Sequence, residues 1–348
     1  MQQSLSEPTE PPLSSTADIS VLIVAFKSRD TIRRCLDALA AQSVVPREVL
    51  LLENGSPEGA RIGADEVPDW VGFVDGEANL GFTGGNNLLA ARASGRWLAL
   101  LNPDAYPHDD WIEKLERATQ TYPDIALFGS TQYAAGKPGQ LDGAGDVYHA
   151  AGLAYRAGYL RPVSLLPEEG EVFGPCGAAT LIRRDVFESL GGYDERLFCY
   201  GEDVDLAFRA RLAGHRAIQL RDAAVGHEGY ASSGRRSEFA TYYGVRNRLW
   251  VFLKNMPGWL FWLLAPVHAA ATLALWLAAF RAGQSGVFGK AIFDGLRGWP
   301  DIMRARRTVQ KTRTVPVVAL ARMLCWDSRK LLTRSPDIRP YSPDSVSS

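Results

Sequence analysis

Short apolar runs alternate with helically spaced apolar residues along the first hundred residues of the chain. Residues 19–26 (ISVLIVAF) form a β-branched run typical of a buried parallel strand, and residues 31–41 carry apolar side chains at helical spacing. The same reasoning predicts strands at residues 48–52, 71–75 and 97–101 and a helix at residues 86–94. This order of strands and helices predicts an α/β fold around a mostly parallel sheet.

Further along the chain, the pattern places acidic residues at the start of an element. Residues 176–182 are typical of a strand of small residues, and residues 202–213 of an amphipathic helix. The first turn of that helix carries Glu202, Asp203 and Asp205, and with Asp194 and Glu195 they make five carboxylates within twelve residues, more than a helix start needs for its dipole. The cluster is therefore a candidate site for chemistry.

Residues 259–280 contain no formally charged side chain. A helix of this length crosses a hydrocarbon core of about 30 Å. Pro266 and His268 near its centre favour a kinked interfacial helix or a re-entrant helix pair instead. A helix buried in the soluble body is a third interpretation. We expect contact with a membrane, by spanning it or by lying on it.

Charge is distributed unevenly along the 348 residues, although the net charge is only -1. Residues 281–334 hold twelve Lys and Arg side chains against Asp294, Asp301 and Asp327. Such a basic region is either a solvated face or a surface for anionic lipid or nucleic acid. Its position directly after the apolar segment favours lipid, and we expect no nucleic-acid partner.

Composition indicates a folded, mainly soluble body, with 46% hydrophobic and 22% charged residues. The four cysteines form no CxxC pair, which fits a reducing compartment. Residues 1–17 are polar and lack the features of a signal peptide. We expect a disordered leader at 1–17, a catalytic domain at 18–255, a helical membrane-associated region at 256–334 and a disordered tail at 335–348.

Candidate ligand-binding residues follow two predicted strands and one glycine-rich segment. In open α/β sheets ligands sit beyond the carboxyl ends of strands, where both Glu53 and Asp104 fall. Residues 79–87 (NLGFTGGNN) open a helix and can bring backbone N–H groups close to phosphates, although a tight turn is the plainer interpretation. A carboxylate at Asp104 can bind a divalent ion that bridges a diphosphate.

His227 follows a short strand-like stretch and could supply a metal nitrogen, although a lone histidine is more often structural. The motifs occur in a fixed order: ENGS at residues 53–56, NLGF to GGNN at 79–87, NPD at 102–104, GGYDE at 191–195, EDVD at 202–205, His227, and YY to RN at 242–247. This ordered set resembles inverting family-2 glycosyltransferases of the GT-A fold, especially the rhamnosyltransferase-like branch. The resemblance covers residues 19–254.

The resemblance implies a role for each matching residue. Asp203 would be the catalytic base, Asp104 and His227 would hold a divalent metal, Mg or Mn, and residues 174–179 would line the acceptor side. Asn102 replaces an earlier carboxylate of the metal motif, and Glu53 stands where the family has Asp. The implied donor-binding residues are Glu53, Asn79, Gly81, Phe82, Gly85, Asn86, Asn102 and Asp104. Further implied site residues are Glu202, Asp205, Cys176 and Gly177.

The implied activity is inverting transfer of a sugar, such as rhamnose, from a nucleoside-diphosphate donor to a polyprenyl-linked or glycan acceptor in cell-surface glycan synthesis. The implied location is the cytoplasmic face of the cell membrane. Two rivals are a non-catalytic membrane-anchored nucleotide-sugar-binding module and a nicotinamide-dependent oxidoreductase. The oxidoreductase is disfavoured because the glycine-rich segment follows the third strand and lacks GxGxxG spacing.

Overall fold

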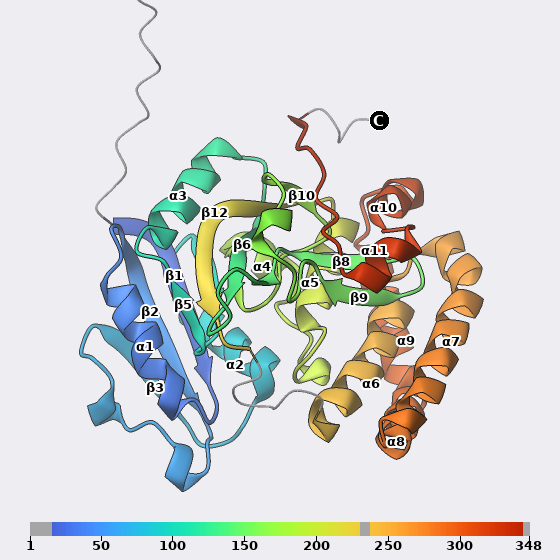
Figure 1. Ribbon diagram of the computed structural model, residues 1–348, viewed down its shortest axis with the longest axis horizontal. Helices are drawn as coiled ribbons and strands as arrows, with labels where there is room; N and C mark the ends of the chain where they lie inside the picture. The colour runs from blue at the N-terminus through green and yellow to red at the C-terminus, as the bar shows by residue number, and fades with distance from the viewer. Residues whose placement is uncertain (1–15, 230–236, 344–348) are drawn as a thin grey trace, which may run out of the picture.

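A mixed β-sheet runs through the centre of the molecule (Figure 1). The computed structural model describes residues 16–229 and 237–343. The strands are β1 (Thr16–Ala25), β2 (Val45–Asn54), β3 (Val71–Gly76), β4 (Trp97–Leu101), β5 (Ala105–Pro107), β6 (Leu127–Ala134), β7 (Leu141–Gly143), β8 (Asp146–His149), β9 (Leu153–Arg156), β10 (Gly170–Val172), β11 (Ala179–Arg183) and β12 (Ala217–His227). Their order in the main sheet is β10-β12-β6-β11-β4-β1-β2-β3, and β8 pairs with β9 in a separate hairpin.

Helices cover both faces of the sheet because apolar side chains alternate along its central strands. Val21 and Ile23 of β1 pack in one core with Leu36, whereas Leu22 packs in a second core with Leu89. The helices up to residue 255 are α1 (Arg29–Ala40), α2 (Gly81–Ala90), α3 (Trp111–Thr121), α4 (Arg184–Ser189), α5 (Glu202–Leu212) and α6 (Glu238–Asn255), with short 3₁₀ turns η1 (Glu58–Ala60), η2 (Ala64–Glu66), η3 (Val163–Leu165) and η4 (Glu195–Leu197).

The parallel part of the sheet agrees with the sequence prediction, but β11 enters antiparallel to its neighbours. β3, β2, β1 and β4 are parallel, whereas Ala179 of β11 pairs with Leu101 of β4 in the opposite direction. The start of β11 therefore lies beside the end of β4, where the Asn102 N–H donates to the Ala178 carbonyl at 2.9 Å. This reversal brings the segment before β11 to the ligand-binding edge of the sheet.

α2 begins at Gly81, five residues before the predicted helix start. Gly81 has φ 70°, and a Cβ there would lie 2.5 Å from the carbonyl oxygen of Phe198. A Cβ at Gly85 would lie 2.7 Å from the side chain of Val24. The glycine-rich segment is therefore the first part of the helix, and these two glycines permit close packing against neighbouring elements.

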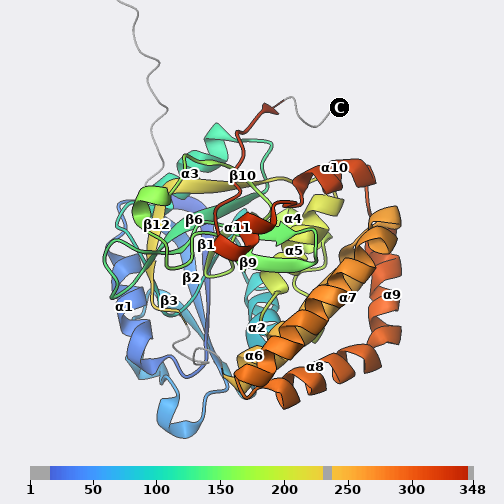
Figure 2. The same cartoon turned by 45° about the vertical axis from the view of Figure 1, so that its right-hand side comes forward.

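The C-terminal helices pack against the body through a shared buried cluster (Figure 2). One buried cluster includes Phe208 of α5, Phe252 of α6, Leu260 and Ile302. The expected C-terminal helical region is thus present. Its helices are α7 (Gly258–Arg281), α8 (Ser285–Arg297), α9 (Trp299–Lys311), α10 (Val317–Met323) and α11 (Ser328–Thr333).

The apolar segment forms one continuous helix, α7, which is long and apolar enough to cross a membrane. Pro266 lies inside it, so the segment is not the helix pair proposed as one alternative. Only 11% of its most apolar stretch is buried, which also argues against a helix buried in the soluble body. His268 contacts the body: its ring stacks on Phe252 at 4.3 Å between centroids, and its Nδ1 lies 3.0 Å from the Ala151 carbonyl oxygen.

Both expected ends of the folded region shift in the structure. Thr16 and Ala17 already belong to β1, and the rest of the expected leader lies outside the described residues.

Residues 335–343 were expected to be disordered, and the structure places them against the body. The backbones of Glu171 and Arg339 exchange two hydrogen bonds, and Tyr341 packs edge-on against Tyr122 at 5.0 Å. The segment is ordered because its backbone hydrogen-bonds to β10. This long-range pairing cannot be predicted from its polar, proline-containing composition. The remainder of the expected tail lies outside the described residues.

Candidate active site

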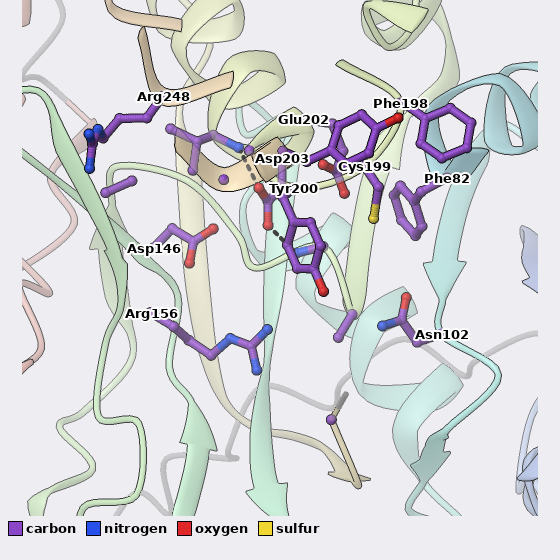
Figure 3. Close-up of a pocket in the computed structure, with 18 of the residues that line it drawn as sticks. Phe82, Asn102, Asp146, Arg156, Phe198, Cys199, Tyr200, Glu202, Asp203 and Arg248 are labelled. Carbon is purple, nitrogen blue, oxygen red and sulfur yellow. Dashed lines mark hydrogen bonds between the residues drawn. The ribbon is translucent and has the colours of Figure 1, made fainter. Parts of the chain in front are cut away.

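A cavity of about 1110 Å³ opens beyond the carboxyl ends of β1 and β4. The β8–β9 hairpin, α5, α6 and one residue of α7, Leu275, complete its walls. Figure 3 shows Asp203 near the middle of the labelled side chains, with Phe82 and Asn102 on one side and Arg248 and Arg156 on the other. Predicted site residues that line this cavity are Asn79, Gly81, Phe82, Asn102, Asp104, Gly177, Glu202, Asp203 and His227.

Asp104 and His227 meet although 122 positions separate them in the chain. Asp104 follows β4, His227 ends β12, and the imidazole Nε2 lies 3.3 Å from the Asp104 carboxylate. The other ring nitrogen, Nδ1, lies 2.7 Å from a carboxylate oxygen of Asp142. Burial alone would lower the pKa of His227, but hydrogen bonds to the two carboxylates outweigh it and raise that pKa. Asp142 thereby fixes the ring with Nε2 toward Asp104.

Asp203 sits in the first turn of α5 with its carboxylate held by backbone donors. One oxygen accepts from the Gly177 N–H at 3.1 Å, and the other accepts from the Val204 N–H at 2.8 Å. The N-terminal end of a helix favours a negative charge at this position. The segment carried to the sheet edge by β11 therefore orients the predicted base.

Asp146 and Cys176 lie beside Asp203, and ligand atoms of the three residues are within 4.8 Å of one another. Burial and the charge of Asp203 raise the pKa of Asp146 well above its usual value. Burial also raises the pKa of the Cys176 thiol to about 12. Protonated groups are poor metal ligands, so the raised pKa values of Asp146 and Cys176 disfavour metal binding at this cluster.

Glu202 lines the cavity next to the predicted base. Burial and the neighbouring Asp203 raise its pKa to about 8, and one of its carboxylate oxygens is buried without a hydrogen-bond partner. The shift favours the protonated form of Glu202, whose carboxyl can donate a hydrogen bond.

The segment between η4 and α5 has a strained backbone. Phe198 and Tyr200 have φ of 65° and 68°, values that such residues adopt rarely. Asn247 of α6 is fully buried, and its amide nitrogen lies 2.7–2.8 Å from the carbonyl oxygens of Leu197, Cys199 and Tyr200. This side chain fixes the segment that carries Tyr200 into the cavity.

Glu53 does not reach the cavity, contrary to the implied nucleotide contact. Its carboxylate is fully buried and accepts from the backbone N–H groups of Ser56 at 2.7 Å and Ile62 at 3.0 Å. Asn54, the next residue, lines the cavity instead and bonds to Asn79 at 3.1 Å. The reason is the alternation of side chains at the end of β2, where Glu53 turns back to hold the following loop.

Four other predicted residues do not line the cavity either. Gly85 packs against β1, Asn86 donates to the Phe82 carbonyl within α2, and Cys176 points to Gln132 rather than into the cavity. Asp205 is fully buried and forms ion pairs with Arg209 at 2.8 Å and Lys254 at 2.7 Å. The residues without a place in the cavity lining are thus Glu53, Gly85, Asn86, Cys176 and Asp205.

The prediction missed several residues that face the cavity or support it. Asp142 lies in β7 and Asp146 begins β8, within the sequence DGAGD, where two carboxylates among glycines were an available signal. Arg156 of β9 forms an ion pair with Asp142. Arg248 of α6 also lines the cavity. It directly follows the YY to RN motif at residues 242–247, which was an available signal.

Comparison with known proteins agrees with this geometry. Residues 20–191 match the family described as Glycosyl transferase family 2. The chain carries a family-2 glycosyltransferase domain. It is 31% identical over 246 residues to an O-antigen biosynthesis protein of Myxococcus xanthus, a match that covers 65% of this chain and 18% of that protein. It is 29% identical over 247 residues to an N-acetylglucosaminyl-diphospho-decaprenol L-rhamnosyltransferase of Mycobacterium tuberculosis, covering 62% of this chain and 78% of that protein.

Solved structures support the GT-A fold of this family-2 glycosyltransferase. Residues 1–349 of S. aureus TarS, in complex with UDP-GlcNAc, superpose with a TM-score of 0.54 at 15% identity, covering 91% of this chain and 92% of that one. GalNAc-T7 with UDP, GalNAc and Mn²⁺ superposes with a TM-score of 0.50 at 18% identity, covering 68% of this chain and 47% of that one. At these identities the similarity concerns the fold.

Proposed function

We propose that the enzyme transfers a sugar, with inversion, from a nucleoside-diphosphate donor to a polyprenyl-linked acceptor in cell-surface glycan synthesis. The observation that carries this proposal is one cavity that contains the Asp104–His227 pair, beyond the end of β4, together with Asp203. Relatives named for O-antigen synthesis and for rhamnosyl transfer to a diphospho-decaprenol acceptor support the substrate class. Rhamnose is accordingly the first donor sugar to test.

The residues around His227 fit a divalent ion. An imidazole nitrogen and a carboxylate oxygen, 3.3 Å apart in the cavity wall, are ligand types that Mg²⁺ or Mn²⁺ accepts. Asn102 lies beside them, with its amide nitrogen 3.4 Å from the same imidazole nitrogen. A bound ion would stabilise the negative charge that develops on the leaving diphosphate. Asp104 and His227 would hold it, and Asp142 would orient the histidine.

Asp203 would accept the proton from the acceptor hydroxyl while that oxygen attacks the anomeric carbon. Burial and the nearby Asp203 carboxylate raise the pKa of the neighbouring Asp146 well above its usual value, which favours the neutral form of Asp146. Backbone donors from Gly177 and Val204 fix the carboxylate of Asp203 in position. A single displacement on the face opposite the leaving group inverts the anomeric centre.

The enzyme would work at the cytoplasmic face of the membrane, with α7 lying along the bilayer surface. Large apolar side chains of this helix are exposed, among them Trp262, Leu273 and Leu277. A surface position is favoured over spanning because His268, near the middle of α7, bonds to Ala151 of the catalytic body. Because the catalytic body contacts the middle of α7, lipid cannot surround the helix there, as it would around a spanning helix.

The proposal is tested by product formation. Purified full-length protein would be incubated with dTDP-rhamnose, UDP-GlcNAc or GDP-mannose, Mn²⁺ or Mg²⁺, and a short polyprenyl-diphosphate-linked GlcNAc. A new disaccharide product, detected by mass spectrometry, supports the glycosyltransferase. Metal-dependent donor binding without any product with the acceptors tried would favour the rival, a non-catalytic membrane-anchored nucleotide-sugar-binding module.

A further inference from the structure

Arg248 is a cationic side chain in the cavity wall that the proposed chemistry does not use. It lies on α6, and its guanidinium is on the opposite side of Asp203 from Phe82 and Asn102 (Figure 3). The proposed function puts the nucleotide on the side of Phe82 and Asn102, which leaves the side of Arg248 for the acceptor.

The charge of Arg248 lacks an anionic partner within residues 16–229 and 237–343. Its Nε is buried without a hydrogen-bond partner. Its guanidinium donates a long hydrogen bond of 3.4 Å to the Thr272 hydroxyl and lies over the face of the Phe288 ring. By contrast, Arg156, also in the cavity wall, is paired with Asp142. A half-buried guanidinium without a carboxylate is unfavourable until an anion binds.

A second unsatisfied donor lines the same part of the cavity. The Tyr148 hydroxyl is buried without a hydrogen-bond partner. Burial raises the pKa of the Tyr148 hydroxyl, and the positive charge of Arg248 lowers this pKa by a smaller amount. The hydroxyl therefore remains a neutral donor. Burial lowers the pKa of Arg248 to about 10, so the guanidinium stays charged at neutral pH. A cation and a hydroxyl donor together suit phosphate oxygens.

The surroundings of Arg248 indicate which kind of phosphate would bind there. Thr272, its hydrogen-bond partner, and Leu275, which lines the cavity, both belong to the exposed apolar helix α7. A ligand with phosphates at Arg248 would thus have an apolar helix beside it. The nucleotide diphosphate, in contrast, is expected near Asp104 and His227 on the other side of Asp203.

We propose that Arg248 and the Tyr148 hydroxyl bind the phosphate groups of a polyisoprenoid-linked acceptor, whose hydrocarbon chain leaves the cavity along α7. This inference rests on the proposed function for the identity of the acceptor. Phosphate contacts at Arg248 would position the acceptor sugar next to Asp203 and would distinguish lipid-linked acceptors from free glycans. Arg248 would act as a specificity-determining residue in acceptor binding.

Binding measurements test this site independently of sugar transfer. Full-length protein in a non-ionic detergent would be titrated with farnesyl diphosphate, with uncharged farnesol and with inorganic pyrophosphate, following tryptophan fluorescence. We expect Arg248→Gln to weaken farnesyl diphosphate binding at least tenfold and to leave farnesol binding unchanged. Tyr148→Phe, which removes only the hydroxyl, should weaken farnesyl diphosphate binding by a smaller factor.

Three controls separate the possible sources of the effect. Arg33→Gln removes one positive charge from the exposed face of α1 and should change nothing. Saturating UDP or dTDP with Mn²⁺ should not displace farnesyl diphosphate. Displacement by the nucleotides would assign the anion site to the donor and overturn the proposal. Equal affinities for pyrophosphate and farnesyl diphosphate would overturn the lipid assignment. The same holds if Arg248→Gln weakens the binding of farnesol as much as the binding of farnesyl diphosphate.

Discussion

Asp203 is the residue on which the proposed transfer chemistry depends most. Asp203→Asn keeps the size of the side chain and removes its ability to accept a proton, so we expect donor binding to persist. Transfer should fall at least about a hundredfold, the scale expected for loss of a positioned general base. Asp185→Asn, the same change at the exposed start of α4, is the matched control. Near-normal turnover of the Asp203 variant, measured as initial rates, would show that another group takes the proton.

The pair formed by Asp104 and His227 predicts a pH-dependent metal affinity. In the metal-free protein the two carboxylates raise the pKa of His227, so a proton competes with the ion for Nε2. Affinity for Mn²⁺ should therefore fall as the pH is lowered through the range in which His227 becomes protonated. Calorimetric titration with Mn²⁺ and UDP between pH 5.5 and 8 measures this.

Substitutions at the same pair separate direct ligands from the residue that orients them. Asp104→Ala and His227→Ala should abolish measurable Mn²⁺ binding in the same titration. Asp142→Asn should weaken it by about ten- to a hundredfold, because Asp142 acts through the orientation of the ring. Unchanged Mn²⁺ affinity in the Asp104 and His227 variants would place the metal elsewhere.

At the scale of elements, Asn247 of α6 connects the C-terminal half of the chain to the strained segment before α5. Asn247→Leu keeps a similar volume but removes the donor to three buried carbonyl groups. We expect a loss of about 1–3 kcal/mol in the free energy of unfolding, the cost of leaving such groups unsatisfied. Turnover should also fall, because Tyr200 and Glu202 follow this segment into the cavity. Chemical denaturation and kinetics of the variant check both effects. A variant as stable and as active as wild type would show that the segment holds its own conformation.

The position of an element can be predicted from the sequence when the local pattern of residues forms it. Its direction or its exact start cannot be predicted when long-range pairing or packing sets it. The runs that became β1 to β4 are apolar and the helix α1 is amphipathic, so their positions followed from residue spacing. β11 was recognisable as a strand, but its direction is set by pairing with β4 and β6. The start of α2 was misjudged because glycines usually indicate a loop, whereas Gly81 and Gly85 serve close packing here.

The site shows the same division. Asp104, Asp203 and His227 stand at element ends within recognisable motifs, and the structure brings Asp104 and His227 into contact. Glu53 stood at the expected place in its motif, yet its carboxylate turns to the backbone of the following loop. Arg248 adjoins the motif at residues 242–247, but the absence of a carboxylate partner for its charge is visible only in three dimensions.

At the scale of the whole molecule, the exposed face of α7 predicts reversible binding to membranes. Full-length protein should sediment with vesicles that contain anionic lipid, and salt should weaken this binding, since each basic residue near the surface adds about 1 kcal/mol. Replacing Trp262 and Leu277 by Ser should reduce sedimentation at both salt concentrations without unfolding the protein, because both side chains are exposed. Protein that stays in the supernatant at low and high salt would refute membrane association.

Truncation after residue 254 is a poorer test, since it would uncover the core shared with α5 and α6.

The buried Lys254 has a consequence for how such enzymes can be recombined. Its ammonium group, at the end of α6, contacts the carboxylates of Asp194 and Asp205, which belong to the central part of the chain. A chimera that joined residues 1–237 of this protein to the C-terminal helices of a relative without this lysine would leave both carboxylates with one cation fewer. Exchanging acceptor specificity by swapping these C-terminal helices should therefore destabilise the fold less when the incoming segment keeps a lysine at the position of Lys254.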